Sequence, residues 1–341
     1  LPLWDDPLWL AEELAEIDVI SRGRLVPGFI RGTGRESISH NIAPPYNWER
    51  MEEAHDLIVK IWTEPGPFTW EGEHYNYRYL NPWAKPYQKP HPQIFIPGVL
   101  SKGTVAFAAR HHYPYIMVAS ELEPTKQSFA YYHQVAAEAG YEAGPQHTGY
   151  LVKVHVDETQ ELAEATARKY IQGPSNPFLV GNEGNVRPHL QNLPGLTQRS
   201  QLLPTLTAWG VAGARGLAGI SEVAAEKQYA AEAARLEREG VTIQHRTIRS
   251  SLEEQFESYS IIAGTPDHVV EKLRYVMDYL RPGSIFLWDG DGAMTHEDAT
   301  RSLRLFGEEV LPAVREIAKE LDLPGPFEVD PLTNRRVGED L

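Results

Sequence analysis

The sequence predicts an α/β protein built around a parallel sheet. Short apolar runs alternate with longer segments in which apolar residues recur at helical spacing, and this alternation is typical of βα units. About five full units can be counted in the 341 residues, whereas a closed (β/α)8 barrel contains eight. With 42% hydrophobic and 23% charged residues, the chain can bury the core of one large domain or of two smaller ones.

The regular elements follow from the apolar spacing and from helix-capping residues. Asp6-Pro7 begins the first expected helix, because Asp accepts the free N–H groups of a first turn and Pro fits there. Residues 64–93 are rich in Pro, Gly and aromatic side chains, so we expect an irregular excursion with a short hairpin. The expected elements are helices at 6–23, 47–63, 101–111, 124–139, 158–171, 222–240 and 296–320, strands at 24–30, 94–97, 115–119, 149–156 and 284–288, and an ordered segment at 260–280.

The bulk composition argues against several classes of protein. A net charge of −15 disfavours a nucleic-acid partner and an anionic membrane surface. The chain has no cysteine, which excludes disulfides and thiolate chemistry, and no apolar run reaches the roughly 18 residues of a membrane span. These features suit a cytoplasmic enzyme. The chain begins with Leu1 rather than Met, and we expect its natural N-terminus to lie upstream.

The stretch 94–112, IFIPGVLSKGTVAFAARHH, joins an apolar strand to an expected helix through two hydroxyl residues. In the simpler interpretation, Ser101 and Thr104 cap the helix. The alternative is a phosphate site, because a helix N-terminus at the carboxyl end of a strand offers free N–H groups and a positive dipole end. Gly103 would let the backbone approach such a ligand. Taken alone, the pattern favours the cap without excluding the phosphate.

Other residues carry weaker signals. Arg31 follows the expected strand at 24–30, and it is either a surface arginine or a guanidinium placed to match a phosphate. The aromatic excursion 62–92 either covers the rim of the sheet or forms a wall of an apolar pocket. Asp289 and Asp291, in LWDGDGAM, most simply form a turn at a strand end, since the calcium-binding EF-hand pattern is not there.

No motif identifies a catalytic or metal-binding residue. The 13 histidines include His111-His112, but none has the spacing of a zinc motif, so we interpret most as surface or core residues and predict no metal. The sequence also lacks G-x-S-x-G, a Walker A loop and the G-x-G-x-x-G of a dinucleotide-binding fold.

Linked motifs nevertheless run through the chain in a fixed order. They are LPLWDDPLWLAEELAEIDVISRGRLVPGFIRG (1–32), ERMEEAHDLIVKIWT (49–63), FTWEGEHY (68–75), KPYQKPHPQIFIPG (85–98), LSKGTVAFAARHHYPY (100–115), AGTPDHVVEKL (263–273) and SLRLFGEEVLPAVR (302–315). Together they resemble the bacterial luciferase-like flavin-dependent monooxygenase family. The resemblance covers about 1–172 and 260–316, whereas 173–250 matches no pattern of that family.

The resemblance implies a (β/α)8 TIM barrel of the luciferase-like type, in which the five strands expected above are the fourth to the eighth. The chain would then lack the N-terminal strands 1–3, apart from the end of the third at "LPL". We therefore expect a single partial barrel domain at 1–325, with an insertion or lid at 173–250, and a C-terminal tail at 326–341.

The resemblance also implies a cofactor and the residues that hold it. Family members bind reduced FMN or, in one branch, the deazaflavin F420. The phosphate-binding residues map onto Arg31, Ser101 and Thr104, with Gly103 beside them, which shifts the interpretation of Ser101 from cap to phosphate. Catalytic residues stay unknown and are expected in the absent N-terminal strands. The residues expected to line the substrate pocket or lid are Ile30, Trp70, Trp83 and Trp288.

The implied function is oxygenation of a small, apolar organic substrate by O2 and reduced FMN through a C4a-(hydro)peroxyflavin. The expected partners are a separate flavin reductase, as in two-component systems, and a second copy of the chain. The alternatives are F420-dependent hydride transfer on the same barrel and a non-catalytic flavin-binding protein. Leu100, Ile30 and Asp5-Asp6 replace a Glu, a reactive Cys and a His pair of luciferase itself, which argues against light emission.

Overall fold

The computed structural model of the chain describes residues 6–32, 40–42, 46–98, 101–118, 121–171, 252–289 and 294–338. The described residues form two compact units, 6–97 and 98–338, which we treat separately as unit 1 and unit 2. The insertion expected at 173–250 lies outside the described residues, as does the helix expected at 222–240.

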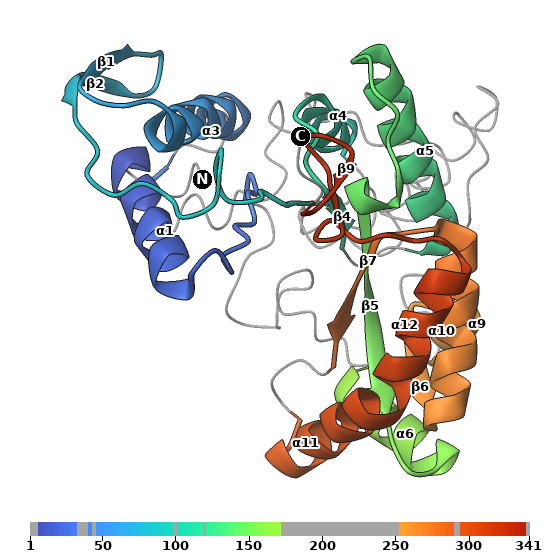
Figure 1. Cartoon of the computed structure of the whole chain (residues 1–341). Coiled ribbons are helices and arrows are strands. Elements are labelled where there is room, and N and C mark those ends of the chain that lie inside the picture. The colour runs from blue at the N-terminus through green and yellow to red at the C-terminus, as the bar shows by residue number, and fades with distance from the viewer. Residues whose placement is uncertain are drawn as a thin grey trace, which may run out of the picture. The chain divides into compact units, whose positions relative to one another are not determined.

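Two helices and a hairpin make up most of unit 1 (Figure 1). Asp6 begins the first helix as expected, because its Oδ1 accepts the Leu8 N–H at 2.9 Å. The indole N–H of the fully buried Trp62 donates to the Ala11 carbonyl at 2.8 Å and joins the two helices. The elements are α1 (Pro7–Ser21), α3 (Asn47–Thr63), β1 (Phe68–Glu71) and β2 (Asn76–Leu80).

The hairpin expected in the aromatic excursion is present, and one carboxylate attaches it to α3. Glu53 accepts hydrogen bonds from the Trp70 indole N–H at 3.1 Å, the His74 N–H at 2.8 Å and the Tyr75 N–H at 2.9 Å. A charged acceptor with three donors is a strong local anchor. The sequence GEHY is therefore held as a tight turn between β1 and β2.

The strand expected at 24–30 is much shorter than predicted. Only a parallel bridge between Gly28 and Phe95 remains, with the Phe29 N–H donating to the Phe95 carbonyl at 2.8 Å. Pro27 explains the difference, because a proline has no N–H with which to continue a ladder.

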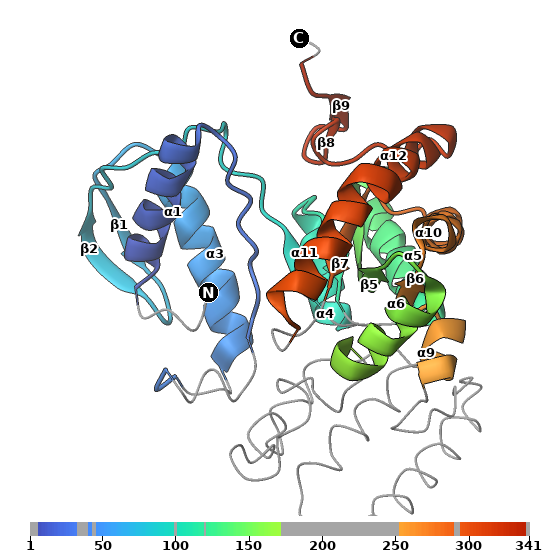
Figure 2. The same cartoon turned by 90° about the horizontal axis from the view of Figure 1, so that it is seen from below.

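Unit 2 is a parallel sheet covered by helices (Figures 1 and 2). Its elements are the end of β3 (Ile96–Gly98), α4 (Lys102–Arg110), β4 (Tyr115–Met117), α5 (Leu122–Glu138), η2 (Pro145–His147), β5 (Thr148–Val156), α6 (Gln160–Thr166), η3 (Ala167–Ile171), α9 (Leu252–Glu257), β6 (Ile261–Gly264), α10 (Pro266–Leu280), β7 (Ser284–Trp288), α11 (His296–Leu305), η6 (Phe306–Val310), α12 (Leu311–Glu320), β8 (Val329–Asp330) and β9 (Arg335–Arg336).

Strand β5 is the centre of this sheet and pairs in parallel with β4, β6 and β7. Ile285 of β7 packs against a buried cluster of α10 and α12, the two helices that flank β5 and β7 in Figure 1. Side chains alternate along a strand, so Trp288, three positions later, lies on the opposite face. Lys153 of β5 is the register partner of Trp288 and shares that face.

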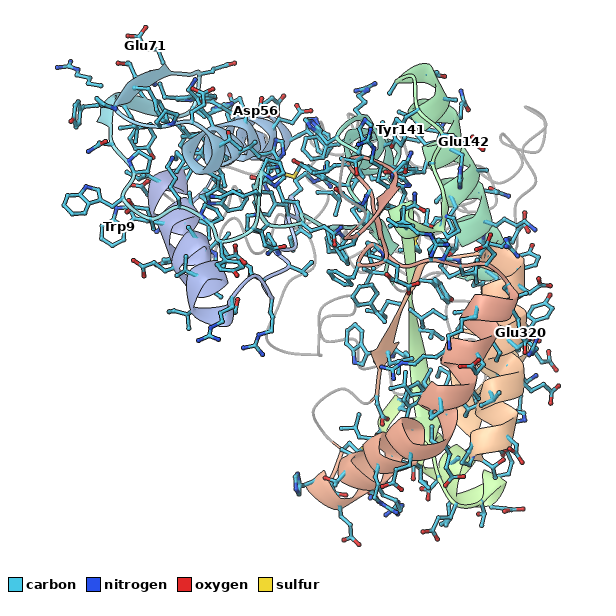
Figure 3. All side chains as sticks on the ribbon, in the orientation of Figure 1. Trp9, Asp56, Glu71, Tyr141, Glu142 and Glu320 are labelled. Carbon is cyan, nitrogen blue, oxygen red and sulfur yellow. The ribbon has the colours of Figure 1, made fainter. Side chains whose placement is uncertain are left out.

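The single helix expected at 296–320 is divided into α11, a π-helical turn and α12. Pro312 in the first turn of α12 has no N–H to donate to the preceding turn, which accounts for the irregularity. None of the described helices is long and apolar enough to cross a membrane. Acidic side chains lie on the outside of both units, among them Asp56, Glu71, Glu142 and Glu320 (Figure 3).

The segment expected to be a tail, 326–341, is attached to unit 2 over its described part. The His147 Nε2–H donates to the Pro331 carbonyl at 2.9 Å. Asn334 donates through Nδ2 to the Glu142 carbonyl at 2.9 Å and accepts from Gln146 Nε2 at 2.7 Å. The short hairpin of β8 and β9 therefore covers the amino end of β5.

Candidate functional site

Ser101 stands at the N-cap position of α4, but among the described residues its hydroxyl caps nothing. Its backbone is extended, at φ −75° and ψ 118°, and its side chain makes no hydrogen bond to the first turn of the helix. The residue is nevertheless buried, with 8% of its surface exposed. A buried hydroxyl beside free helical N–H groups is suited to an anionic ligand rather than to the helix itself. Gly103 and Thr104 lie half-buried in the same first turn.

The backbone in front of α4 is packed too closely to carry a side chain. A Cβ on Gly98 would lie 2.9 Å from the Tyr115 ring and 3.0 Å from Thr104 Cγ2. The Gly98 carbonyl also accepts the Val118 N–H at 3.0 Å, which fixes the end of β3 against the end of β4. Tyr115 is fully buried and cannot yield space. Glycine therefore sets the position from which the chain enters the α4 N-terminus.

Arg31 belongs to unit 1, whereas Ser101, Gly103 and Thr104 belong to unit 2. Burial lowers the pKa of Arg31 from its ordinary value, although an arginine stays protonated at neutral pH. A partly desolvated guanidinium attracts an anion more strongly than one in water. That Arg31 and Ser101 bind one phosphate stays a prediction.

The predicted pocket residues have different environments. Trp70 lies in the β1–β2 hairpin with its indole N–H satisfied by Glu53, while Trp83 is 90% exposed and Ile30 is 42% exposed. Trp288 is half-buried at the carboxyl end of β7, and the Lys153 ammonium lies 5.9 Å from its ring centre. Among the four, Trp288 lies at the carboxyl ends of the parallel strands, where α/β folds bind their ligands.

A buried cluster of polar and charged side chains at the carboxyl ends of β5 and β7 was not predicted from the sequence. His155, near the end of β5, is fully buried, and its Nδ1 lies 2.8 Å from Asp289 Oδ1. A carboxylate can only accept, so Nδ1 carries the proton of this hydrogen bond. Nε2 has no hydrogen-bond partner in the described part of the chain. The available signal was that both residues end predicted strands, but residues 134 positions apart could not be paired from sequence.

Asp157 and Arg301 complete the cluster. Asp157 is fully buried, and it accepts two hydrogen bonds from Arg301, from Nε and Nη2, both at 3.0 Å. Burial alone would raise the pKa of Asp157, but the bonds from Arg301 and from the Glu158 N–H outweigh it and hold the pKa below its ordinary value. The same contact, together with Asp298, raises the pKa of Arg301. Both Asp157 and Arg301 are therefore ionised, and their ion pair joins α11 to the end of β5.

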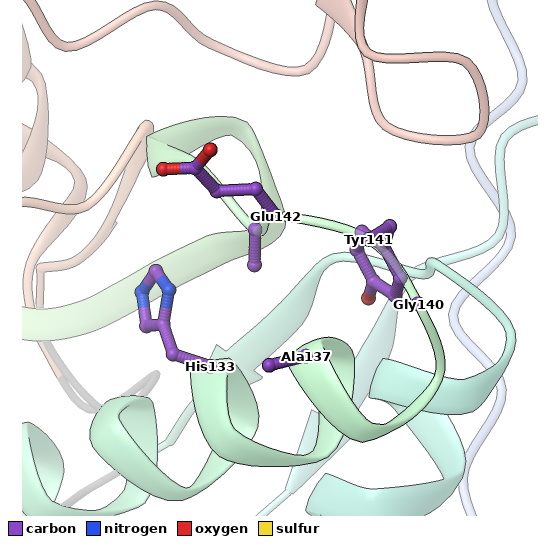
Figure 4. Close-up of a pocket in the computed structure, with 6 residues that line it drawn as sticks. His133, Ala137, Gly140, Tyr141 and Glu142 are labelled. Carbon is purple, nitrogen blue, oxygen red and sulfur yellow. The ribbon is translucent and has the colours of Figure 1, made fainter.

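An open groove of about 540 Å³ lies elsewhere in unit 2, between the end of α5 and the turn that leads to β5. Figure 4 shows His133, Tyr141 and Glu142 around it. The groove is near the amino end of β5, opposite the edge that carries His155. Active sites of (β/α)8 barrels lie at the carboxyl ends of the strands, so this groove is not the candidate site.

Within the described ranges, no group of three or more His, Cys, Asp or Glu side chains could hold a metal ion. Asp291, considered for calcium with Asp289, lies outside those ranges. Asp289 Oδ1 accepts the hydrogen bond from His155 Nδ1.

Comparison with known proteins relates this arrangement to one family. Residues 1–280 match the family model described as luciferase-like monooxygenase. The FMNH2-dependent dimethylsulfone monooxygenase of Pseudomonas putida is 27% identical over 189 residues, which are 52% of this chain and 49% of that protein. The chain therefore spans about half the length of this curated relative.

Solved structures share the fold. The oxygenating constituent of 3,6-diketocamphane monooxygenase from the CAM plasmid of Pseudomonas putida, in complex with FMN, has a TM-score of 0.63 at 20% identity, over 92% of this chain and 77% of that one. Monooxygenase RslO1 from Streptomyces bottropensis gives 0.60 at 19% identity, over 91% and 75%. An F420-dependent secondary alcohol dehydrogenase in complex with an F420-acetone adduct gives 0.57 at 14% identity, over 91% and 76%. The TIM-barrel fold predicted from the sequence is thus confirmed.

Proposed function

The chain belongs to the luciferase-like monooxygenase family, and on that premise we propose that it is a monooxygenase that uses reduced FMN and O2 to oxygenate a small organic substrate. The observation that carries the proposal is the α4 N-terminus, where Ser101 is buried and does not cap its helix. When bound, reduced FMN supplies the electrons with which one atom of O2 enters the substrate and the other leaves as water.

The residues present fit a flavin phosphate. Ser101 and Thr104 would donate their hydroxyl hydrogens, and the free N–H groups around Gly103 would add the positive end of the helix dipole. Gly98 keeps the approach to this turn free of a side chain. Arg31 stays the charged donor that the sequence resemblance predicts for this phosphate, with a guanidinium fork that suits its oxygens. The donors are the chemistry that a phosphate monoester requires, and no metal is needed to complete them.

The substrate would bind at the carboxyl ends of the strands, against apolar surface that excludes water. We infer that Trp288 forms part of this wall, with Ile30, Trp70 and Trp83 as further predicted members. An indole presents a large apolar surface with little conformational entropy to lose. A small, largely apolar compound is the substrate class that suits such a wall.

The second candidate is hydride transfer with F420 on the same barrel. It is supported by the solved F420-dependent alcohol dehydrogenase, which shares the fold. The phosphate donors at α4 suit either cofactor, so cofactor preference separates the two functions. A monooxygenase of this kind also needs a flavin reductase that supplies reduced FMN, and we further propose a homodimer as the assembled enzyme.

The test is oxygen transfer in a reconstituted system. The full chain is mixed with a flavin reductase, NADH, FMN, catalase and 18O2, and a panel of small sulfones, cyclic ketones and alkanes is searched for products by mass spectrometry. We expect a product that carries one 18O atom and that is lost when FMN is omitted. Reduction of F420 by an alcohol, without such a product, would establish the second candidate instead.

A matched variant shows whether the α4 N-terminus is responsible. Ser101→Ala should weaken reduced FMN binding, whereas Ser128→Ala should not, because the Ser128 hydroxyl donates to the Pro124 carbonyl of its own helix. Flavin binding without any turnover would contradict the proposed activity and leave a flavin-binding protein.

A further inference from the structure

The contact between His155 and Asp289 begins where the ladder between β5 and β7 ends. The last register pair of the two strands is Lys153 with Trp288. Asp289, directly after Trp288, is the first residue of this segment outside the ladder. Its Oδ1 accepts the His155 Nδ1–H at 2.8 Å, and its side chain is only 12% exposed. A side-chain hydrogen bond thus replaces the next backbone pair.

The His155 ring is held through one atom only. Nε2 has no hydrogen-bond partner in the described part of the chain, and the nearest carboxylate oxygen, Asp157 Oδ2, lies 3.7 Å away. Asp157 is itself occupied by Arg301. A fully buried imidazole with one unsatisfied nitrogen costs stability. A leucine would fill such a space without this cost, so the ring's useful property is the directional donor at Nδ1.

What that donor fixes is the direction in which Trp288 leaves the strand. Trp288 is itself paired with Lys153 in the ladder, and the next residue, Asp289, is held by its hydrogen bond to His155. With the residue paired and its successor held, the backbone of Trp288 is fixed, which sets the direction of its Cα–Cβ bond and limits the positions open to the indole, whose ring centre lies 5.9 Å from the Lys153 ammonium. Without the hydrogen bond between His155 and Asp289, the backbone on the carboxyl side of Trp288 would be free to rotate.

We propose that His155 is a positioning residue that, through Asp289, fixes the indole of Trp288 as the substrate-facing wall at the carboxyl end of β7. The substrate-facing part of this inference rests on the proposed function. The positioning itself is a property of the protein without any ligand. The proposal also explains why a buried histidine with only Nδ1 hydrogen-bonded lies at the carboxyl end of β5, where ligand sites of such folds are found.

The test uses two amides that differ in which histidine nitrogen they imitate. In His155→Asn the amide nitrogen takes the place of Nδ1 and can still donate to Asp289. In His155→Gln it takes the place of Nε2 and cannot. The full chain is labelled with 5-fluorotryptophan, and the 19F resonance of Trp288 is identified by its loss in Trp288→Phe. We expect His155→Asn to keep the resonance in place and His155→Gln to shift or split it.

A second pair keeps the inference testable if either histidine variant fails to fold by circular dichroism. Asp289→Asn retains the acceptor oxygen and should leave the Trp288 resonance unchanged, whereas Asp289→Ala should shift it. Equal behaviour of the two members of a pair, whether both shift or neither does, would overturn the positioning role. The 19F readout needs no flavin. Failure of the chain to bind FMN would therefore contradict the proposed function, but it would not decide whether His155 positions Trp288.

The consequence for turnover is measured with whichever substrate the 18O2 assay identifies. His155→Gln should raise KM about tenfold with little change in kcat, because a displaced wall weakens ground and transition state alike. His155→Asn should restore KM. An unchanged KM in His155→Gln, despite a shifted Trp288 resonance, would show that the indole does not face the substrate.

Discussion

The two ends of β5 each carry a buried histidine, and the two are used in opposite ways. At the amino end, both ring nitrogens of His147 have partners, since Nδ1 accepts the Gly144 N–H at 3.1 Å and Nε2 donates to the Pro331 carbonyl at 2.9 Å. At the carboxyl end, His155 has one partner, Asp289, and one unsatisfied nitrogen. His147 is thus held through both nitrogens by neutral hydrogen bonds, whereas the carboxyl end carries the ion pair of Asp157 and Arg301.

This difference matches the division of labour in barrel folds, in which the amino ends of strands stabilise and the carboxyl ends bind ligands. Fully hydrogen-bonded networks make a structure rigid, and His147 belongs to such a network, whereas His155 leaves one nitrogen for which the fold supplies no partner among the described residues. The following variants separate the two ends, from the largest expected effect to the smallest.

Arg301→Ala should cause the largest loss, at the carboxyl end. It leaves the buried carboxylate of Asp157 without its ion pair, which we expect to lower the free energy of unfolding by about 3 kcal/mol. Arg304→Ala, one turn along α11, is the matched control, because its pair with Glu308 at 3.6 Å is exposed and worth less than about 0.5 kcal/mol. Urea unfolding measures both. Equal losses of unfolding free energy in the two variants would mean that the pair of Asp157 and Arg301 stabilises the protein no more than an exposed ion pair does.

Acid should destabilise the amino end. Burial lowers the pKa of His112, His133 and His147 at this end, and also that of His268 in the first turn of α10. The unfolded chain therefore takes up protons below about pH 6.5, before the folded protein does, so the free energy of unfolding falls as the pH drops. The expected slope is about 1.4 kcal/mol per pH unit for each such proton. His147→Gln should flatten the slope in urea titrations between about pH 7.5 and pH 5.5. A wild-type stability that is constant over this range would refute the account.

Gly98→Ala should have an intermediate effect and act on the candidate site directly. The added Cβ meets the Tyr115 ring at 2.9 Å, so we expect a loss of about 1–3 kcal/mol and weaker FMN binding. Gly28→Ala is the control, because its Cβ would come no closer than 3.5 Å to any neighbour outside the adjoining residues. Thermal unfolding and a flavin titration of both variants make the comparison. An undisturbed Gly98→Ala protein would show that the turn before α4 is loosely packed.

Asn334→Gly should have the smallest effect. Glycine tolerates the positive φ of 56° at this position, so the change removes the two side-chain hydrogen bonds to Glu142 and Gln146 without backbone strain. One of these bonds is exposed and the other partly buried. Each contributes about 0.5–1 kcal/mol, so urea unfolding should show a loss of about 1 kcal/mol. Asn334→Asp keeps the acceptor and should lose about half as much. A loss beyond that of Arg301→Ala would reverse the ranking of the two ends.

The sequence was sufficient for most local structure. The helix at 47–63 was predicted with its observed bounds, and Asp6 begins α1 as expected. Ser101 was recognised as a candidate because a hydroxyl before a helix is visible locally. The contacts of His155 with Asp289 and of Asp157 with Arg301 join residues 134 and 144 positions apart. Such pairs depend on strand register and helix placement, which local patterns do not specify.

The central claim is that the α4 N-terminus binds the flavin phosphate, and an anaerobic titration of reduced FMN tests it most directly. The titration compares the full chain with Ser101→Ala and with Ser128→Ala, whose hydroxyl is bonded within α5. The account predicts a dissociation constant raised about tenfold in Ser101→Ala, as expected for loss of a hydrogen bond to a charged group, and unchanged in Ser128→Ala. Equal affinity of all three proteins would contradict it.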